Sequence, residues 1–217
     1  MIRGKLIVID GADGSGKRTQ AELLLKRLKK AKKKAVLISF PQYSQFFGKL
    51  VRCYLNGEFG KLNEVDAHLT SVLYAADRWQ AKEKINDWLK KDYIVIADRY
   101  AESNMAHQTA KIFSPLKRKR FLKWLNDLEY GNFQIPRADM VLYLDVAVEI
   151  GQKLMDGRGK KDIHEADIDY LKKVQNQYRN FCKTRKNWHC VICAQNGKIL
   201  SREQIAEKIW EVVGKKI

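Results

Sequence analysis

The chain has 217 residues and a net charge of +17, from 42 Lys and Arg against 25 Asp and Glu. With 45% hydrophobic and 31% charged residues, the composition is typical of a globular protein and excludes a disordered chain. No run approaches the roughly eighteen apolar residues of a membrane-spanning helix, so we expect no membrane partner. The opening run is too short and too charged for a signal peptide, and we therefore expect a cytoplasmic protein.

Short apolar runs alternate with longer amphipathic segments along the chain. The predicted strands are 5–10, 35–40, 93–98, 140–145 and 189–193. The predicted helices are 17–32, 46–55, 66–89, 100–113, 115–128, 148–155, 167–183 and 201–213. The strand runs are apolar at both odd and even positions, which is typical of a sheet covered on both faces. Strands separated by helices predict a single α/β domain, residues 1–217, with a five-stranded parallel sheet in the middle of three layers.

A glycine-rich loop follows the first predicted strand and precedes a helix. Its G-x-x-x-x-G-K pattern lies between a predicted strand and a predicted helix, which is where a phosphate-binding P-loop occurs. Glycines let successive N–H groups face a phosphate, and the helix N-terminus adds partial positive charge. Lys17 is expected to reach the outer phosphates and to be catalytic. The residues predicted to bind ATP are Gly11, Ala12, Asp13, Gly14, Ser15, Gly16, Lys17, Arg18 and Thr19.

The position after Lys17 departs from the usual P-loop pattern. A Ser or Thr there normally helps to hold Mg²⁺ through its hydroxyl group. This chain has Arg18 instead, and Thr19 lies one place later on the helix. Two interpretations stay open: other oxygens hold the metal while Arg18 adds charge toward phosphate, or catalysis is impaired.

The third predicted strand ends in Asp98-Arg99-Tyr100, with Ser103 on the following turn. Because the carboxyl ends of parallel strands meet at one edge of a sheet, this segment should face the P-loop. A carboxylate there can position Mg²⁺, and the neighbouring guanidinium can bind a second phosphate bidentately. We therefore predict that Asp98 and Arg99 are catalytic.

These motifs together resemble the thymidylate kinase family over essentially the full length of the chain. The resemblance rests on four segments: the loop at 11–17 with Thr19-Gln20, Phe40-Pro41, the D-R-Y-x-x-S pattern at 98–103, and P-x-x-D at 136–139. It implies a P-loop NTPase fold and transfer of the ATP γ-phosphate to dTMP. It also implies Mg²⁺ as cofactor and a homodimer formed through helices near 46–90.

The resemblance implies roles for residues on the acceptor side. Tyr74 would stack on thymine and Arg78 would hydrogen-bond a base carbonyl. The residues expected to bind dTMP are Asp13, Tyr74, Arg78, Arg99, Ser103, Asn104, His107 and Gln108. The residues alone leave an alternative open, in which Tyr74 belongs to the core and Arg78 pairs with a helix acid such as Asp77. After Phe40-Pro41 the family commonly has an arginine, and this chain has Gln42 and Tyr43.

The segment 155–166 is basic and contains glycine, and it is typical of a lid that closes over phosphate. An arginine brought in by closure would stabilise the transferring group. Arg158 is the first candidate, as a catalytic residue, with Lys160 and Lys161 as alternatives. The predicted metal ligands are Asp13, Asp98 and Glu165, the last of which would compensate for the missing hydroxyl at position 18.

Two further features allow more than one interpretation. The lysine clusters at 29–34 and 117–120 favour solvated helix ends over nucleic-acid binding, because no recognition motif accompanies them. Cys190 and Cys193 have C-x-x-C spacing, but buried thiols explain them better than zinc or redox chemistry. The rival functions are another nucleotide or deoxynucleoside kinase, and an impaired nucleotide-binding protein with affinity for nucleic acid.

Overall fold

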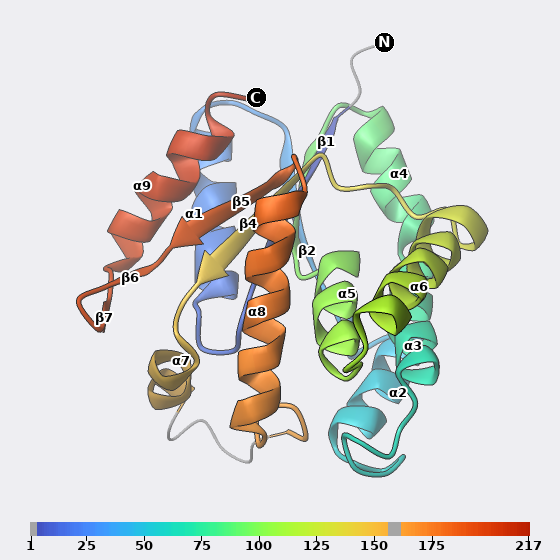
Figure 1. Ribbon diagram of the computed structural model, residues 1–217. Helices are drawn as coiled ribbons and strands as arrows, with labels where there is room; N and C mark the ends of the chain where they lie inside the picture. The colour runs from blue at the N-terminus through green and yellow to red at the C-terminus, as the bar shows by residue number, and fades with distance from the viewer. Residues whose placement is uncertain (1–3, 156–161) are drawn as a thin grey trace.

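The computed structural model describes residues 4–155 and 162–217 (Figure 1). Its centre is a sheet of five strands in the order β2-β3-β1-β4-β5, in which every pairing is parallel. The strands are β1 (Lys5–Gly11), β2 (Ala35–Ser39), β3 (Ile94–Asp98), β4 (Met140–Asp145) and β5 (Trp188–Ile192). The predicted five-stranded parallel sheet is therefore confirmed, with each strand close to its predicted range.

Helices connect the strands and cover both faces of the sheet (Figure 1). They are α1 (Lys17–Lys30), α2 (Phe46–Leu55), α3 (Ala67–Gln80), α4 (Lys82–Lys90), α5 (Ala101–Ala110), α6 (Pro115–Asn126), the π-helix η1 (Asp127–Asn132), α7 (Val148–Met155), α8 (Ile168–Thr184) and α9 (Arg202–Val213). Helices α1 and α9 lie on one face, whereas α4, α5 and α8 lie on the other.

Strand β1 shows why both faces must be covered. Ile7 and Ile9 belong to the apolar cluster under α1 and α9, and Leu6 and Val8 belong to the cluster under α4, α5 and α8. All four side chains are fully buried. Successive side chains of a strand point to opposite faces, so an all-apolar strand requires a helix layer on each side.

The helix boundaries differ from the prediction in several places, of which two are the largest. The predicted helix 66–89 is two helices, α3 and α4, which are separated at Ala81. The predicted helix 100–113 ends at Ala110. In both places the apolar periodicity continues past the end of the helix, because residues of the following turn still pack on the core. Periodicity therefore located these helices without fixing where they end.

A two-stranded hairpin after β5 was missing from the predicted elements. Strands β6 (Ala194–Gln195) and β7 (Lys198–Ile199) pair antiparallel across Asn196 and Gly197, which both have positive φ angles. An Asn-Gly pair is a strong signal for this type of tight hairpin, so the sequence contained the information. Just before the hairpin, Cys193 is buried and Cys190 is exposed, and the two thiols occupy different environments.

In the part of the chain that the structure describes, no helix combines the length and the apolar character needed to cross a membrane.

Candidate active site

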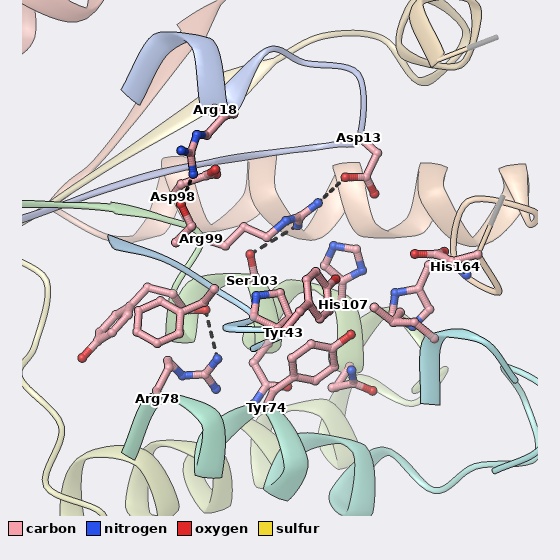
Figure 2. Close-up of a pocket in the computed structure, with 18 of the residues that line it drawn as sticks. Asp13, Arg18, Tyr43, Tyr74, Arg78, Asp98, Arg99, Ser103, His107 and His164 are labelled. Atoms are coloured by element: carbon pink, nitrogen blue, oxygen red, sulfur yellow. Dashed lines mark hydrogen bonds and ion pairs between the residues drawn. The ribbon is translucent and has the colours of Figure 1, made fainter. Parts of the chain in front are cut away.

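A cavity of about 470 Å³ lies at the carboxyl ends of the parallel strands. Its walls come from the P-loop, the ends of β2 and β3, the helices α3 and α5, and the segment 162–165 (Figure 2). Among the predicted site residues, it is lined by Asp13, Arg18, Tyr74, Arg78, Asp98, Arg99, Ser103, Asn104, His107, Gln108 and Glu165. The fold therefore brings the predicted acceptor residues to one cavity.

The P-loop connects the end of β1 to the start of α1, as predicted. Gly14 and Gly16 have φ angles of 78° and 82°, a region that glycine adopts readily. The residue between them, Ser15, is buried and its N–H donates to the carbonyl of Ala12 at 3.1 Å. Gly16 is the N-cap of α1, so the free N–H groups of the first helical turn lie beside this loop. The remaining predicted ATP-binding residues, Gly11, Ala12, Lys17 and Thr19, belong to the same strand–loop–helix unit.

The P-loop packs backbone to backbone against α7. A Cβ atom added to Gly14 would lie 2.3 Å from the carbonyl oxygen of Gly151, and one added to Gly151 would lie 2.6 Å from the carbonyl oxygen of Asp13. Only glycine at both positions permits this approach. The P-loop is therefore held directly against the helix that leads into the predicted lid segment.

Lys17 and Arg99 meet at a single carboxylate. The ammonium group of Lys17 lies 3.3 Å from Oδ1 of Asp13. Nη2 of Arg99 forms an ion pair with the same oxygen (Figure 2). Lys17 also donates to the carbonyl of Ala12 at 2.9 Å. Burial alone would raise the pKa of Asp13, but Arg99 and Lys17 together hold it well below its usual range. The cations predicted for two different phosphates thus lie side by side.

Arg99 is held in an unusual backbone conformation. Its φ angle is 63°, in the left-handed region that non-glycine residues rarely adopt, and its N–H donates to the carbonyl of Ile9 at 3.0 Å. Such strain is common where a side chain must be aimed at a ligand. The guanidinium group points across the cavity toward Asp13, and Nη1 lies 3.5 Å from Oγ of Ser103 (Figure 2).

A buried carboxylate beneath Arg99 fixes the residues around it. Asp10 is fully buried at the end of β1 and accepts hydrogen bonds from Ser103 at 2.7 and 2.8 Å and from Tyr178 at 2.9 Å. Its Oδ1 lies 3.9 Å from Nη1 of Arg99. Ser103 therefore positions Asp10 and Arg99 from α5. The sequence prediction missed Tyr178, since nothing in the pattern of α8 distinguishes it from other core residues.

Arg18 extends from α1 toward the end of β2. Its Nη1 donates to the hydroxyl of Ser39 at 2.8 Å, and its Nε lies 2.6 Å from Glu22 one helical turn away. The side chain is 62% exposed and lines the cavity. A hydroxyl group thus lies next to Arg18, but it comes from β2 rather than from the P-loop.

Three polar residues of α5 present unpartnered atoms to the cavity. Gln108 is fully buried, and neither its amide oxygen nor its amide nitrogen has a hydrogen-bond partner among the described residues. The same is true of Oδ1 of Asn104 and Nε2 of His107. Burying such groups without a partner costs about 1–3 kcal/mol each. Several unpartnered polar atoms in one cavity wall are expected when a polar ligand supplies their missing hydrogen-bond partners.

His107 is stacked on a second imidazole that the sequence prediction did not include. The ring of His164 lies 5.3 Å from that of His107, at an interplanar angle of 18°. Burial, with His164 and Arg99 nearby, holds the pKa of His107 well below its usual range, so the ring is neutral. Burial and the Lys111 charge lower the pKa of His164 to about 3. Only three-dimensional structure shows this pair, because the two residues are far apart along the chain.

Tyr74 and Arg78 lie on the same face of α3, as their spacing predicts. Tyr74 lines the cavity between α3 and α5, and burial raises its pKa. Arg78 is only 2% exposed and pairs with Glu129, with Nε at 3.1 Å from Oε2. The alternative partner, Asp77, instead accepts from the N–H of Gln42 at 3.0 Å. Arg78 also lines the cavity, and its ion pair with Glu129 holds the guanidinium group in place.

The carboxylates that line the cavity could hold Mg²⁺ only if phosphate oxygens supplied further ligands. Among the described residues, no three His, Cys, Asp or Glu side chains form a cluster that could hold a metal alone. Asp98 lies at the end of β3, and burial raises its pKa against the opposing charges of Lys17 and Arg99. Mg²⁺ in phosphoryl-transfer sites is commonly held by one or two carboxylates plus substrate phosphates. Asp98 and Glu165 both line the cavity and are the predicted ligands that are open to such a site, whereas Asp13 is already paired with two cations.

Part of the predicted lid lies outside the described residues. Arg158, Lys160 and Lys161 belong to that part, so the role of Arg158 stays a prediction. The adjoining residues form a turn in which Asp162 accepts from the N–H groups of His164 and Glu165, both at 2.8 Å. Burial and the nearby Glu165 raise the pKa of Asp162 to about 6.

Comparison with known proteins gives a consistent result. A family model described as thymidylate kinase matches residues 9–205. The thymidylate kinase of Schizosaccharomyces pombe is 33% identical over 181 residues, which cover 82% of this chain and 80% of that protein. The thymidylate kinase of Mycobacterium tuberculosis is 30% identical over 175 residues, covering 80% and 81%. The solved structure of the Candida albicans thymidylate kinase superimposes with a TM-score of 0.74 at 26% identity, covering 98% of this chain and 92% of that one.

Proposed function

The chain belongs to the thymidylate kinase family, and we propose that it transfers the γ-phosphate of ATP to dTMP, giving dTDP and ADP. The observation that best supports this function is the meeting of Lys17 and Arg99 at Asp13. One cation belongs to the P-loop after β1, and the other follows the neighbouring parallel strand β3. Two phosphate-bearing molecules bound by these residues would lie end to end, as in-line transfer requires.

On the donor side, the phosphates of ATP would lie over residues 11–19. The N–H groups of the loop and of the first turn of α1 would hold them, and Lys17 would follow the transferring group. Lys17 already lies beside the loop carbonyl of Ala12, so little side-chain ordering is needed when ATP binds. Arg18, which lines the cavity at the carboxyl ends of the strands, would supply a further positive charge.

On the acceptor side, dTMP would occupy the cavity between α3 and α5. Its phosphate would displace Asp13 from Arg99, which is already aimed across the cavity. Tyr74 would stack on thymine, while Arg78, Asn104 and Gln108 would hydrogen-bond its edge. The unpartnered amide atoms on α5 support this role, since a pyrimidine carries both donors and acceptors. His107, held flat by His164, would lie against the sugar.

No residue needs to act as a nucleophile, because the phosphate of dTMP is itself one. The protein contributes position and positive charge around the transferring group. Asp98, with Glu165, would hold a Mg²⁺ ion bound to the phosphates of ATP, and that ion supplies positive charge against the negative charge of the phosphates. We further propose that Arg158 adds a guanidinium from the lid segment 155–166.

We also propose a cytoplasmic homodimer. Large apolar side chains are exposed on two neighbouring helices: Phe46 on α2 is 66% exposed, and Leu69 and Trp79 on α3 are 54% and 47% exposed. Helices α2 and α3 pack side by side, so a second copy that covered both helices could bury these side chains. Burying them against a second copy would remove apolar area from water. Light scattering on a sizing column should give twice the mass of the 25.3 kDa chain.

A coupled assay of ADP release with a panel of acceptors tests the proposed function. We expect dTMP to give the highest kcat/KM, with Mg²⁺ required, and thymidine and purine monophosphates to be poor acceptors. Faster transfer to another monophosphate would contradict the assignment of dTMP. ATP binding without transfer to any acceptor would favour the alternative in which Arg18, in place of Ser or Thr, impairs catalysis.

A further inference from the structure

The edge of the sheet opposite the cavity collects lysines from five separate segments. These are the last turn of α1, the loop into β2, the end of α4, the start of β1 and the C-terminal segment. Together they provide the amino-edge lysines: Lys5, Lys29, Lys30, Lys32, Lys33, Lys34, Lys90, Lys91, Lys215 and Lys216. All of them are exposed except Lys5, which is half-buried. In Figure 1 these segments lie along the upper edge, and the P-loop and α7 lie at the lower edge.

Contacts between the segments show that these lysines share one surface. Nζ of Lys34 lies 3.5 Å from the carbonyl oxygen of Lys91, and Nζ of Lys5 donates to the carbonyl of Lys216. Strand pairing places Ala35 and Lys5 opposite the same residue, Ile94, on either side of β3. In the sequence these lysines form unrelated short runs, and the parallel sheet brings them together.

The acidic residues nearby offset part of this charge, and Asp92, which directly follows Lys91, is exposed within these segments. Asp139 accepts a hydrogen bond from the N–H of Leu6 at 2.8 Å, and Glu207 pairs with Arg27 at 2.6 Å. The carboxylates at strand ends lie at the other edge, where Asp10, Asp98 and Asp145 end β1, β3 and β4. The amino edge is therefore strongly positive, whereas carboxylates and cations are mixed around the cavity.

Helix termini explain only some of the amino-edge lysines. A cation near the last turn of a helix interacts favourably with the helix dipole, which accounts for Lys29, Lys30 and Lys90. Lys33, Lys34 and Lys5 lie beyond the helices and gain no such stabilisation. Like charges packed on one surface repel each other and destabilise the fold. A polyanion bound to this edge would remove that repulsion.

The shape of the edge and its composition favour a nucleic acid. Five strands spaced by about 4.8 Å make an edge roughly 20 Å long. Duplex DNA carries one negative charge per about 1.7 Å of its axis, so several phosphates would face an edge of this length. A membrane surface is less suitable, because the large apolar side chains that are exposed among the described residues lie on other segments. We propose that the amino edge binds the phosphate backbone of a nucleic acid without reading its base sequence.

This binding would be independent of kinase activity. Strand β1 spans seven residues, so the amino edge lies about 20 Å from the P-loop. A bound duplex would therefore leave the cavity open, and the amino-edge lysines can be changed without touching the proposed catalytic residues. ATP at saturating concentration should not displace the duplex.

The test is fluorescence anisotropy of a labelled DNA duplex of about 30 base pairs, titrated with the full chain at about 50 to 200 mM NaCl. We expect Lys30→Gln/Lys33→Gln/Lys91→Gln to raise the Kd at least about tenfold and to lower the slope of log K against log salt by about 2 to 3. The matched control, Lys117→Gln/Lys119→Gln/Lys123→Gln on α6, removes the same charge and should change the Kd less than about threefold. Activity toward dTMP should stay at the wild-type level in both variants, and the melting temperature should not fall in either.

A second amino-edge variant, Lys29→Gln/Lys215→Gln, changes two other lysines, one of them in the C-terminal segment, and should also weaken binding. Four outcomes would overturn the proposal. They are equal loss in the edge and control variants, wild-type protein that fails to bind duplex at 50 mM NaCl, displacement of the duplex by ATP, and tighter binding to phosphatidylserine vesicles than to DNA.

Discussion

Replacing Gln108 by Leu should have opposite effects on stability and on substrate recognition. Gln108 is fully buried on α5, and both polar atoms of its amide lack partners among the described residues. A buried, unpaired polar group costs about 1–3 kcal/mol, and leucine of similar size avoids that cost. We therefore expect the free protein to gain about 1–3 kcal/mol, which is a rise in Tm of a few degrees for a chain of this size.

The same change should weaken recognition of dTMP. If the Gln108 amide hydrogen-bonds the base, its loss leaves the polar edge of thymine unpaired in the complex. A penalty of about 1–3 kcal/mol corresponds to a rise in KM of roughly 5- to 150-fold, with the KM for ATP unchanged. Thermal melting with and without dTMP, together with initial rates, measures both effects on one sample.

Gln175 provides the matched control on α8. It is also buried, but its amide donates to Oδ1 of Asp145 at 3.1 Å and to the carbonyl of Val146 at 2.8 Å. Gln175→Leu should therefore destabilise the protein and leave the KM for dTMP unchanged. The reasoning fails if Gln108→Leu lowers the Tm and leaves the KM for dTMP at the wild-type value.

Three further predictions concern the P-loop and a buried carboxyl group. Lys17→Met should lower kcat by about 10²–10³ in the coupled assay, because it removes one cation from the transferring group. Gly14→Ala should lower kcat/KM about a hundredfold, since its Cβ would lie 2.3 Å from the carbonyl oxygen of Gly151 and would displace the loop. Gly131→Ala is the control and should leave kcat/KM unchanged, because a Cβ there meets nothing within 4 Å. Burial raises the pKa of Glu102 from 4.5 to about 7, so wild-type stability should fall as the pH rises through this range. Urea unfolding should then find Glu102→Gln more stable by about 3 kcal/mol above pH 8 and equal near pH 4, and a constant difference across this range would contradict the assignment.

The parts of the site predicted from sequence are those encoded in contiguous residues. The P-loop needs only a strand, a glycine-rich loop and a helix in succession, and each has a local signal. The D-R-Y segment follows a short apolar strand, and the parallel topology then places Arg99 opposite Lys17. The five strands were found because a sheet covered on both faces requires apolar residues at both odd and even positions.

The parts that sequence did not predict depend on contacts between distant segments. The residues alone left open that Arg78 pairs with a neighbouring helix acid such as Asp77, and its partner in the structure is Glu129 of the π-helix η1. The stacking of His107 on His164 and the hydrogen bond from Tyr178 to Asp10 likewise join segments that no local pattern relates. The amino-edge lysines show the same limit, because the charge of each run is visible in the sequence and their common surface is not.

The central claim is that the two phosphate sites meet end to end, and a bisubstrate ligand tests it most directly. In such a ligand, adenosine and thymidine are joined 5′ to 5′ through five phosphates. If Lys17 and Arg99 serve adjoining sites, calorimetry should show it binding at least about a hundredfold more tightly than dTMP or ATP alone, because the second contact becomes intramolecular. An affinity no better than that of the tighter single nucleotide would mean that the two cations do not serve a common reaction centre.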